Sequence, residues 1–346
     1  MRTEWLSAAE ALDRAPEWDV LHARASGSPF QSRSWQTAWW ETFARSGRVR
    51  VLSVWDGDDL CAWLPLWFGV GVVRAAGFGV SDFLDPLLDP GRPDATGALV
   101  GELARLRTTV VVPEVRPGRF AEALAGAGWE CEDQSTCLSL SLPDTYDRFL
   151  GGLSKSLRYD ARAPHRKAFV GKGYSVEFAS DLLQGYDALE RLHRLRWRQR
   201  GQPGVFWGRT SRFHRRFLSA PQGVGVWMPL LLCRGEPVGA VYAFAASGAC
   251  WFYQAGFDPA HRSVSPGTVL IAALAERAIG EGLSRFEMLR GDEGYKRRWQ
   301  PDEEFQTRWS MLPGRAAWAE RARFAAEQAI KRKFEGGGAE RIRTAE

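Results

Sequence analysis

The stretch from His261 to Val269 combines side chains and backbone groups that favour the binding of an anion. Ser265 followed by Pro266 predicts the start of a helix, with the serine as N-cap and the proline at the first helical position. The backbone N–H groups of a first helical turn lack partners within the helix, and the helix dipole adds partial positive charge there. The unpaired N–H groups are expected to be those of Gly267, Thr268 and Val269.

Two further features support this prediction. Gly267 has no side chain that would keep a ligand away from the backbone, and Arg262 and His261 lie just upstream. A phosphate or pyrophosphate fits such a helix start. The alternative is an ordinary strand-to-helix turn, which often carries the same residue types, and spacing alone does not separate the two.

Three predicted elements hold this helix start in place. Residues 250–257 alternate aromatic and small side chains and end at Asp258–Pro259, which predicts a buried strand closed by a turn. The helix that begins at Pro266 is expected to end at Gly280, and residues 283–289 predict a second strand. The segment is therefore expected to run strand, loop, helix, strand.

Three phrases in this region resemble one known family. They are Tyr-Gln-Ala-Gly-Phe-Asp-Pro from Tyr253, Ser-Pro-Gly-Thr from Ser265 and Leu-Arg-Gly-Asp-Glu-Gly-Tyr-Lys-Arg-Arg-Trp from Leu289. Together they resemble the C-terminal half of the CelD-type acetyltransferases, which belong to the GNAT superfamily of acyl-CoA-dependent N-acyltransferases and are related to the Fem peptidyltransferases. GNAT proteins usually grip the cofactor pyrophosphate with a loop that reads Gln or Arg, two residues, Gly. Residues 262–267 lack that first glycine, which leaves the identity of the donor open.

The resemblance implies a donor site between two strands. GNAT proteins hold acyl-CoA where neighbouring strands splay apart, and the matching strands here are residues 251–257 and 285–289. The thioester is implied to lie near Tyr253 and Glu287. The implied cofactor contacts are Phe257, Arg262, Ser265, Gly267, Thr268 and Val269. The implied substrate contacts are Arg196, Trp197, Tyr253 and Arg290, although Trp197 also fits an ordinary core position.

Direct acyl transfer to an amine needs a base for the ammonium proton and an acid for the leaving thiolate. The candidate bases, which the sequence does not rank, are Glu287, Asp292 and Glu293. Tyr295 resembles the GNAT tyrosine that protonates the thiolate, although packing against Trp299 explains it equally well. Lys296 belongs to a Tyr-Lys phrase shared with the Fem family, which implies a lysine that polarises the reacting group or binds phosphate.

The composition suits two ordinary domains without a metal or a disulfide framework. The chain has 346 residues, 45% of them hydrophobic, and its 16 Trp and 19 Phe supply material for two cores. Five cysteines are scattered without a CxxC pair, and five histidines show no HExxH spacing, so no metal is expected. No apolar run reaches the ~18 residues of a membrane span, and the first residues lack a signal-peptide core, so we expect a soluble, cytoplasmic protein.

Positive charge is concentrated in residues 155–172. Six basic residues there face one acidic residue, and this excess equals the net charge of +5 of the whole chain. Four of the basic residues are spaced three or four apart, as on one helical face: Lys155, Arg158, Arg162 and Arg166. Pro164 is expected to bend or break that helix. The face is either a solvated surface between domains or a guide for an anion, such as the phosphates of acyl-CoA, an acidic substrate or tRNA.

The N-terminal half is expected to be α/β without a donor site. Residues 1–45 are predicted to be mostly helical, with Trp35, Trp39 and Phe43 on the core face of one helix. Residues 49–68 predict two strands joined by a hairpin turn. No glycine-containing helix start of the kind at Gly267 occurs in this half, so it resembles a GNAT-like domain that has lost cofactor binding.

The predicted fold class is α/β (α+β), with two tandem GNAT-like domains whose mixed, largely antiparallel sheets are flanked by helices. Within the second domain, residues 224–257 predict an antiparallel meander of three strands. The expected boundaries are an N-terminal domain at 1–145, a basic helical linker at 146–173, an acyltransferase domain at 174–313 and a C-terminal helix and tail at 314–346.

The predicted function is N-acyl transfer from acetyl-CoA or a longer acyl-CoA to an amine, carried by a small molecule or a saccharide. One alternative is an aminoacyl-tRNA-dependent, amide-forming transferase of the Fem kind, which would use the basic segment to bind tRNA. Another is a non-catalytic binding protein whose basic surface recruits an anionic partner. The sequence leaves the acyl chain, the acceptor, the pathway and the oligomeric state open.

Overall fold

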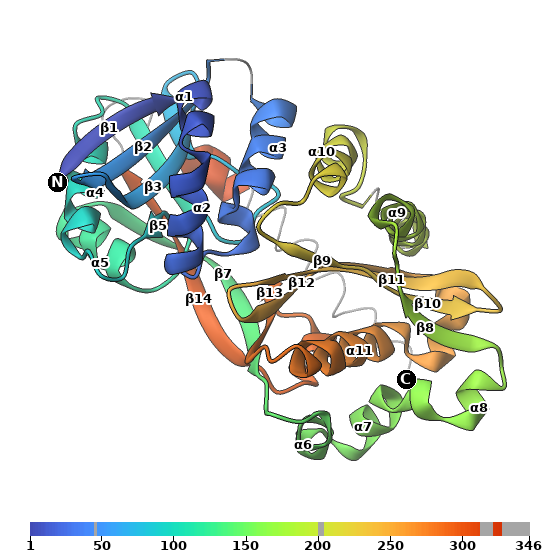
Figure 1. Ribbon diagram of the computed structural model, residues 1–346. Coiled ribbons are helices and arrows are strands. Elements are labelled where there is room, and N and C mark those ends of the chain that lie inside the picture. The colour runs from blue at the N-terminus through green and yellow to red at the C-terminus, as the bar shows by residue number, and fades with distance from the viewer. Residues whose placement is uncertain (45–46, 200–203, 312–320, 327–346) are drawn as a thin grey trace.

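The computed structural model describes residues 1–44, 47–199, 204–311 and 321–326. Figure 1 shows two lobes side by side, joined by two long strands. We call residues 2–126 the N-terminal lobe and residues 146–297 the C-terminal lobe.

The N-terminal lobe is a curved sheet with helices on both faces (Figure 1). Its strands are β1 (Arg2–Ser7), β2 (Val49–Asp56), β3 (Asp59–Phe68), β4 (Val72–Ala75), β5 (Leu87–Leu88) and β6 (Thr109–Val115). Its helices are α1 (Ala8–Asp13), α2 (Ala15–Arg24), η1 (Pro29–Gln31), α3 (Arg33–Phe43), α4 (Asp94–Ala104) and α5 (Arg119–Gly126). The predicted hairpin is β2 and β3, and its turn contains Gly57 at a φ of 60°, which favours glycine.

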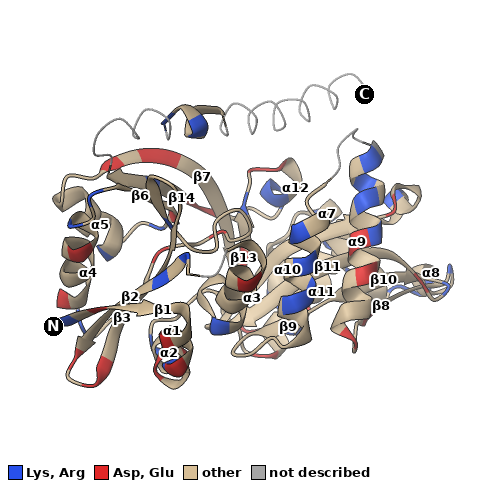
Figure 2. Cartoon of the chain, turned by 90° about the horizontal axis from the view of Figure 1, so that it is seen from above, with Lys and Arg blue, Asp and Glu red and all other residues tan. Residues whose placement is uncertain are grey.

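The C-terminal lobe is a sheet with α11 on one face and α9 and α10 on the other (Figure 1). Its strands are β8 (Tyr174–Phe178), β9 (Gly225–Trp227), β10 (Pro229–Cys233), β11 (Glu236–Ala246), β12 (Ala249–Phe257) and β13 (Arg285–Arg290). Its helices are α6 (Tyr146–Gly152), α7 (Lys155–Ala161), η2 (Ala163–His165), α8 (Lys167–Val170), α9 (Leu182–Gln199), α10 (Gly208–Ser219), η3 (Pro259–Val264), α11 (Pro266–Gly280) and α12 (Gly294–Arg297). Lys and Arg residues recur on α9 and around α8 (Figure 2).

Two connecting strands, β7 (Glu130–Ser141) and β14 (Asp302–Met311), merge the lobes into one sheet. The sheet order is β1-β2-β3-β4-β6-β14-β7-β13-β12-β11-β10-β8, with β5 beside β3 and β9 beside β11. Strand β7 pairs with β14 over most of its length and with β13 at its C-terminal end. Strand β14 therefore returns from the C-terminal lobe to pair with β6 of the N-terminal lobe.

The lobes also share a hydrophobic core. Trp35 of α3 packs against Phe213 of α10 and Phe244 of β11, with ring centres 4.8 Å and 5.6 Å apart. Trp35 and Trp39 lie in this core and Phe43 packs against it, which confirms the predicted aromatic face of α3. A second core lies between the C-terminal sheet and α6, α7 and α11, and a third lies under α4 and α5.

Most of the predicted elements are confirmed, including the antiparallel meander β10-β11-β12. The prediction for the first residues is wrong in part, because Arg2–Ser7 forms strand β1 against β2. Helix α10 was not predicted. A C-terminal helix was predicted within residues 314–346. Of these, the structure describes residues 321–326, and they are helical. The rest of the predicted helix and tail lies outside the described residues.

The basic segment does not form the single helical face that the spacing predicts. Helix α7 ends at Ala161, and the 3₁₀ turn η2 with Pro164 follows it. Proline removes a helical hydrogen bond and blocks the preceding turn, so Arg166 falls outside the helix that carries Lys155 and Arg158. No helix in the described part of the chain is long and apolar enough to cross a membrane.

Candidate active site

Strands β12 and β13 form a parallel pair at the centre of the C-terminal lobe. Their register joins Ala249 with Arg285 and Trp251 with Glu287, and the pairing ends there. Beyond this point β12 continues to Phe257, while β13 remains paired with β7 on its other edge. Past Trp251, the facing edges of the two strands have no ladder partner among the described residues. Unpaired strand edges offer N–H and C=O groups to an extended ligand.

Both strands carry a bulge where they separate. In β12 the register against β11 shifts between Tyr242 and Ala243, which leaves Tyr253 as the extra residue. In β13 the register against β7 shifts between Glu287 and Leu289, and Leu289 has a φ of 60°. A bulge adds one residue to a strand and bends it away from its neighbour. The bulges accompany the opening of a wedge between β12 and β13, which we call the β12–β13 wedge.

Helix α11 follows the end of β12 through η3. Ser265 is its N-cap and Pro266 its first residue, as predicted. The side chain of Ser265 does not cap the helix, because Ser265 has a φ of 53° and its hydroxyl donates to Asp160 Oδ2 at 3.2 Å. Gly267 borders open space, since a Cβ atom at this position would meet no atom within 4 Å.

Two residues at this helix start differ from the prediction. The backbone N–H of Val269 donates to Ser265 O at 3.1 Å, because Val269 is the first residue whose fourth predecessor offers a carbonyl. The ring Nδ1 of His261 is 2.8 Å from the hydroxyl of Tyr174. The groups that remain for an anion are the N–H groups of Gly267 and Thr268 and the exposed side chain of Arg262.

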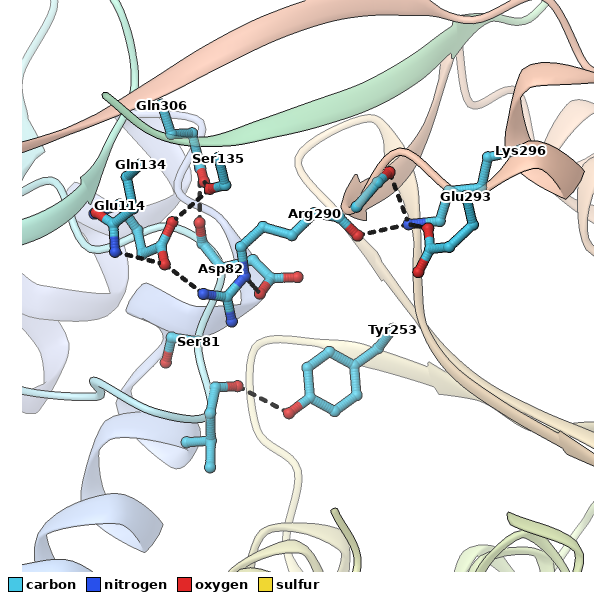
Figure 3. Close-up of polar contacts among 12 residues, drawn as sticks. Ser81, Asp82, Glu114, Gln134, Ser135, Tyr253, Arg290, Glu293, Lys296 and Gln306 are labelled. Carbon is cyan, nitrogen blue, oxygen red and sulfur yellow. Dashed lines mark hydrogen bonds and ion pairs between the residues drawn. The ribbon is translucent and has the colours of Figure 1, made fainter. Parts of the chain in front are cut away.

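A charge network at the lobe junction engages Arg290 at the end of β13 (Figure 3). The guanidinium lies between two carboxylates: Nε is 2.5 Å from Asp82 Oδ1, and Nη1 contacts Glu114 Oε1. Asp82 and Glu114 are only 7% and 4% exposed. Burial alone lowers the pKa of Arg290, but the two carboxylates raise it above its ordinary value. Arg290 therefore stays charged and is bound by the N-terminal lobe.

Amide and hydroxyl groups complete this network (Figure 3). Gln134 Nε2 and Ser135 Oγ of β7 donate to the two oxygens of Glu114 at 2.8 Å and 2.9 Å. Gln306 of β14 donates to the backbone carbonyl of Asp82 at 2.6 Å. The network therefore ties β6, β7, β14 and the loop before β5 to the end of β13.

Tyr253 reaches from the bulge of β12 to the same loop (Figure 3). Its hydroxyl donates to Val80 O at 2.8 Å, and its ring lies 5.5 Å from that of Trp35. Burial and the nearby Asp82 raise the pKa of this phenol well above its ordinary value. The predicted substrate contacts Tyr253 and Arg290 thus come together, and both bind residues of the N-terminal lobe.

Lys296 closes the turn between β13 and α12 (Figure 3). Its Nζ donates to Arg290 O at 2.5 Å and lies 3.0 Å from Glu293 Oε2. The residue is 3% exposed. Gly291 has a φ of 105°, and a side chain there would collide with the Glu293 carboxylate. Lys296 and Gly291 therefore fix the path of the backbone next to the β12–β13 wedge.

Tyr295, Arg196 and Phe257 gather at the end of β12. The guanidinium of Arg196, on α9, lies 5.0 Å from the centre of the Phe257 ring. Burial raises the pKa of Tyr295, and the neighbouring Arg196 acts against this rise. The phenol therefore stays protonated at neutral pH, and its raised pKa makes it a weaker acid than an ordinary tyrosine. Trp197 is partly buried beside His193, with ring centres 5.7 Å apart.

The three candidate bases lie in different surroundings. Glu287 is 6% exposed and lies 2.5 Å from Arg285 Nε; burial raises its pKa, which Arg285 opposes. Asp292 is exposed, and its hydrogen bond with Arg297 lowers its pKa. Glu293 is half-exposed beside Lys296. Of Glu287 and Asp292, it is Glu287 whose surroundings shift the carboxylate pKa towards neutral pH, which is the direction a general base needs.

The acidic partners of Arg290 were not predicted from the sequence. Asp82 lies in a stretch whose residue types predict only a loop. Glu114 carries a clearer signal, because a carboxylate within the apolar run of β6 has to find a partner when that strand is buried. In the described part of the chain, no group of three or more His, Cys, Asp or Glu side chains is placed to bind a metal ion.

A model of a known protein family matches the part of the chain that contains the β12–β13 wedge. The family model described as acetyltransferase (GNAT) domain matches residues 155–297, which contain β12, α11, β13 and α12. A search among curated proteins found no match.

Three solved structures share the fold at low sequence identity. FemX is 10% identical with a TM-score of 0.68, and the match covers 90% of this chain and 97% of FemX. L-PGS from Bacillus licheniformis is 10% identical with a TM-score of 0.56, covering 85% and 90%. The tandem GNAT protein from the clavulanic acid biosynthesis pathway, solved without AcCoA, is 16% identical with a TM-score of 0.50, covering 91% and 99%. The predicted mixed α/β fold with a largely antiparallel sheet flanked by helices is confirmed.

Proposed function

We propose that the protein is an N-acyltransferase that moves an acyl group directly from acyl-CoA to an amine. The observation that carries this proposal is the β12–β13 wedge. Its unpaired edges lead to a helix start at which Gly267 leaves space for an anion. An extended thioester with a pyrophosphate at one end matches both features.

The donor would lie along β12. Backbone groups from Phe252 to Phe257 would bind its extended arm, and the N–H groups of Gly267 and Thr268 with Arg262 would bind its pyrophosphate. Ser265 would shape this site through its bond with Asp160 rather than by capping the helix. Val269 would contribute packing, because its N–H is used within α11.

Two side chains of the protein would carry out the proton transfers of the reaction, one as base and one as acid. Acyl-CoA supplies an activated carbonyl, and Glu287 is our first candidate for the base that accepts the ammonium proton, because burial raises its pKa. We assign protonation of the leaving thiolate to Tyr295 because this residue resembles the GNAT tyrosine with that role; burial raises the pKa of the phenol, which works against the transfer. Lys296 and Asp292 would act on the loop: Lys296 holds its carbonyls, and Asp292 binds Arg297.

The acceptor would enter from the side of the wedge that faces the N-terminal lobe. Arg196 and Trp197 lie on α9, with Arg196 beside the end of β12, and Tyr253 and Arg290 lie at the lobe junction. Because Tyr253 and Arg290 already bind the N-terminal lobe, they would shape the acceptor site. The resemblance to CelD-type enzymes suggests a small-molecule or saccharide amine as acceptor.

Calorimetric titration tests the donor. Purified protein is titrated with acetyl-CoA, a long-chain acyl-CoA and free CoA, followed by a screen of amines with the donor that binds. Micromolar binding of one of them with acyl transfer would support the proposal. No binding of any would contradict it.

A second candidate is an aminoacyl-tRNA-dependent, amide-forming transferase. The fold likeness to FemX and the basic residues of α7 and η2 favour it. Amide formation from charged tRNA that ribonuclease abolishes, without any use of acyl-CoA, would establish this function instead. A protein that binds an anionic partner but neither donor would be a non-catalytic binding protein.

We also propose that the N-terminal domain, about residues 1–145, does not bind a donor, and that residues 146–173 and 174–313 are the linker and acyltransferase domain. Donor binding with a stoichiometry of one per chain would support this division. A stoichiometry of two would contradict it.

A further inference from the structure

An open cleft of about 840 Å³ runs along α7 and the following turn η2. It is lined by residues of the basic segment: Ser154, Lys155, Ser156, Arg158, Tyr159, Asp160, Arg162 and Arg166. Ligand sites commonly have volumes of roughly 300–1,000 Å³. We call this the α7 cleft. It is large enough for a nucleotide.

The charges that line the α7 cleft favour an anion. Four basic side chains face a single carboxylate, that of Asp160. This carboxylate accepts a hydrogen bond from Ser265 and lies 3.7 Å from Arg298. The Asp160 carboxylate is therefore already paired within the protein. The electrostatic potential in the cleft is positive, because the four basic side chains outnumber this carboxylate.

Two arginines of the cleft each have a guanidinium nitrogen without a hydrogen-bond partner among the described residues. Arg158 Nη2 donates to Gly151 O and Leu153 O at 2.8 Å each, while its Nε has no hydrogen-bond partner among the described residues. Arg166 Nη1 is likewise buried without one. These two atoms are covered by protein, so a phosphate in the cleft would bind the remaining N–H groups of the two guanidinium groups, which are charged donors.

Tyr159 offers a platform for a planar group. Its side chain is 65% exposed, and the guanidinium of Arg166 lies 3.7 Å from the centre of its ring. This contact holds the ring in place from one side. An exposed aromatic ring next to arginines is the arrangement on which nucleic-acid bases stack.

The α7 cleft adjoins the start of α11. Helix α7 packs on α11 (Figure 1). The carboxylate of Asp160 in the cleft accepts a hydrogen bond from the hydroxyl of Ser265, the N-cap of α11. A ligand with a pyrophosphate at Gly267 would therefore have its nucleoside and remaining phosphate next to α7.

We propose that the α7 cleft binds the nucleotide end of the acyl donor, with adenine stacked on Tyr159 and phosphate bound by Arg158, Arg162 and Arg166. This rests on the proposed function for the position of the donor. CoA and tRNA both end in a phosphorylated adenosine, but only in CoA do a pyrophosphate and an extended arm separate this adenosine from the reacting carbonyl. In a charged tRNA the terminal ribose carries the reacting ester itself, so the proposal is made for CoA, and RNA binding is an outcome of the test. The cleft would then set affinity for the donor without touching the reacting carbonyl.

The experiment measures binding of three probes by calorimetry at two salt concentrations. The probes are adenosine 3′,5′-bisphosphate, CoA, and a short RNA ending in CCA. The variants are Tyr159→Ala, Tyr159→Phe and Arg166→Ala. The controls are Phe305→Ala, an aromatic residue 63% exposed on β14, and Arg105→Ala, an exposed arginine of the N-terminal lobe. Tyr159 and both control residues are exposed and Arg166 is partly buried, so thermal unfolding checks that each variant is folded.

We expect Tyr159→Ala and Arg166→Ala each to weaken binding of the bisphosphate roughly ten-fold or more, and Tyr159→Phe to retain it, because stacking needs only the ring. Higher salt should weaken binding to wild type more than to Arg166→Ala. Both controls should bind as wild type does. A matching loss for CoA identifies CoA as the source, and a loss only for RNA identifies tRNA.

The possible failures are distinct. If CoA or RNA binds but the variants at Tyr159 and Arg166 bind equally well, the α7 cleft is excluded and the proposed function stands. If the bisphosphate binds in a manner that depends on Tyr159, while neither CoA nor RNA binds, the cleft stands and the proposed function is wrong. If the bisphosphate does not bind at millimolar concentration, the cleft proposal is overturned.

Discussion

In the described part of the chain each lobe contains one parallel strand pair, and the two pairs differ where a donor would bind. In the N-terminal lobe β4 pairs with β6 up to Arg74 and ends one residue later, at Ala75. In the C-terminal lobe β12 continues to Phe257 beyond its last paired residue, Trp251. Strand β4 therefore leaves almost no edge beyond the paired region, whereas β12 leaves a long one.

The helices that follow these strands differ as well. Helix α4 has the carboxylate of Asp94 in its first turn, which repels a phosphate and already occupies the positive end of the helix dipole. Helix α11 has no acidic residue in its first turn, and Gly267 leaves space there. If the donor binds where we propose, similar topology is not enough for a donor site, and a free strand edge and an uncharged helix start are also needed.

The largest expected effect concerns the chemistry of the β12–β13 wedge. We expect Glu287→Gln to lower kcat roughly 100-fold or more, because an amide cannot accept the ammonium proton. In wild type, kcat/KM should fall with decreasing pH through a pKa above the ordinary value of 4.5, since burial raises this pKa. The matched control is Glu122→Gln, an exposed position of the N-terminal lobe. An unchanged kcat for Glu287→Gln would remove Glu287 from the mechanism.

A second prediction concerns the junction between the lobes. Arg290→Met should reduce the free energy of unfolding by about 3 kcal/mol, because it leaves the carboxylates of Asp82 and Glu114 buried without their partner. Denaturant unfolding measures this change. Arg105→Met, which removes an exposed arginine from its ion pair with Glu102 in the N-terminal lobe, should leave the unfolding midpoint almost unchanged. Equal effects of the two substitutions would show that the free energy of unfolding does not depend on the charge network around Arg290.

A third prediction concerns acid stability, where the lobes should differ. Burial lowers the pKa of His214 to about 3 and that of His193 to about 4, so both are neutral in the folded protein. In the unfolded chain both histidines have the ordinary pKa of 6.5 and bind protons below that pH, whereas in the folded protein they stay neutral. The free energy of unfolding therefore decreases as the pH falls from 6.5 towards 4. The slope is up to about 1.4 kcal/mol per pH unit for each histidine.

His214→Phe tests the acid-stability prediction in the C-terminal lobe. The ring of His214 lies among aromatic rings and neither nitrogen has a hydrogen-bond partner among the described residues. The variant should therefore lose part of the dependence of stability on pH. In the N-terminal lobe the buried ring of His22 hydrogen-bonds to Ser28 O, which opposes the decrease in its pKa. A larger change in the pH profile for His22→Phe than for His214→Phe would contradict this comparison.

The sequence predicted the local features of the C-terminal lobe well. Ser265 and Pro266 mark the start of α11, and the turn residues around Arg234 and Gly248 separate the strands of the meander. These signals are local, because a cap or a turn requires particular residue types at fixed neighbouring positions. The free N–H groups were assigned one residue too far, since counting from the cap places Val269 within the bonded part of the helix.

The sequence could not predict how the lobes meet. Strand β14 follows the C-terminal lobe but pairs with β6, and no pattern within its residues indicates this partner. Likewise, Arg290 and Asp82 are more than 200 residues apart, and only the assembled sheet brings them together. Strand β1 was missed because its six residues gain their stability from pairing with β2 rather than from their own pattern. Contacts of this kind depend on tertiary packing.

The most direct test of the central claim compares one substitution in the two lobes. Gly267→Trp at the start of α11 and Gly97→Trp in the first turns of α4 both place a large ring where a Cβ atom would meet no atom within 4 Å. Calorimetric titration with the acyl-CoA that binds wild type measures the affinity of each variant. We predict that Gly267→Trp abolishes micromolar binding and that Gly97→Trp leaves it unchanged. Undiminished binding by Gly267→Trp would contradict the assignment of the donor to the β12–β13 wedge.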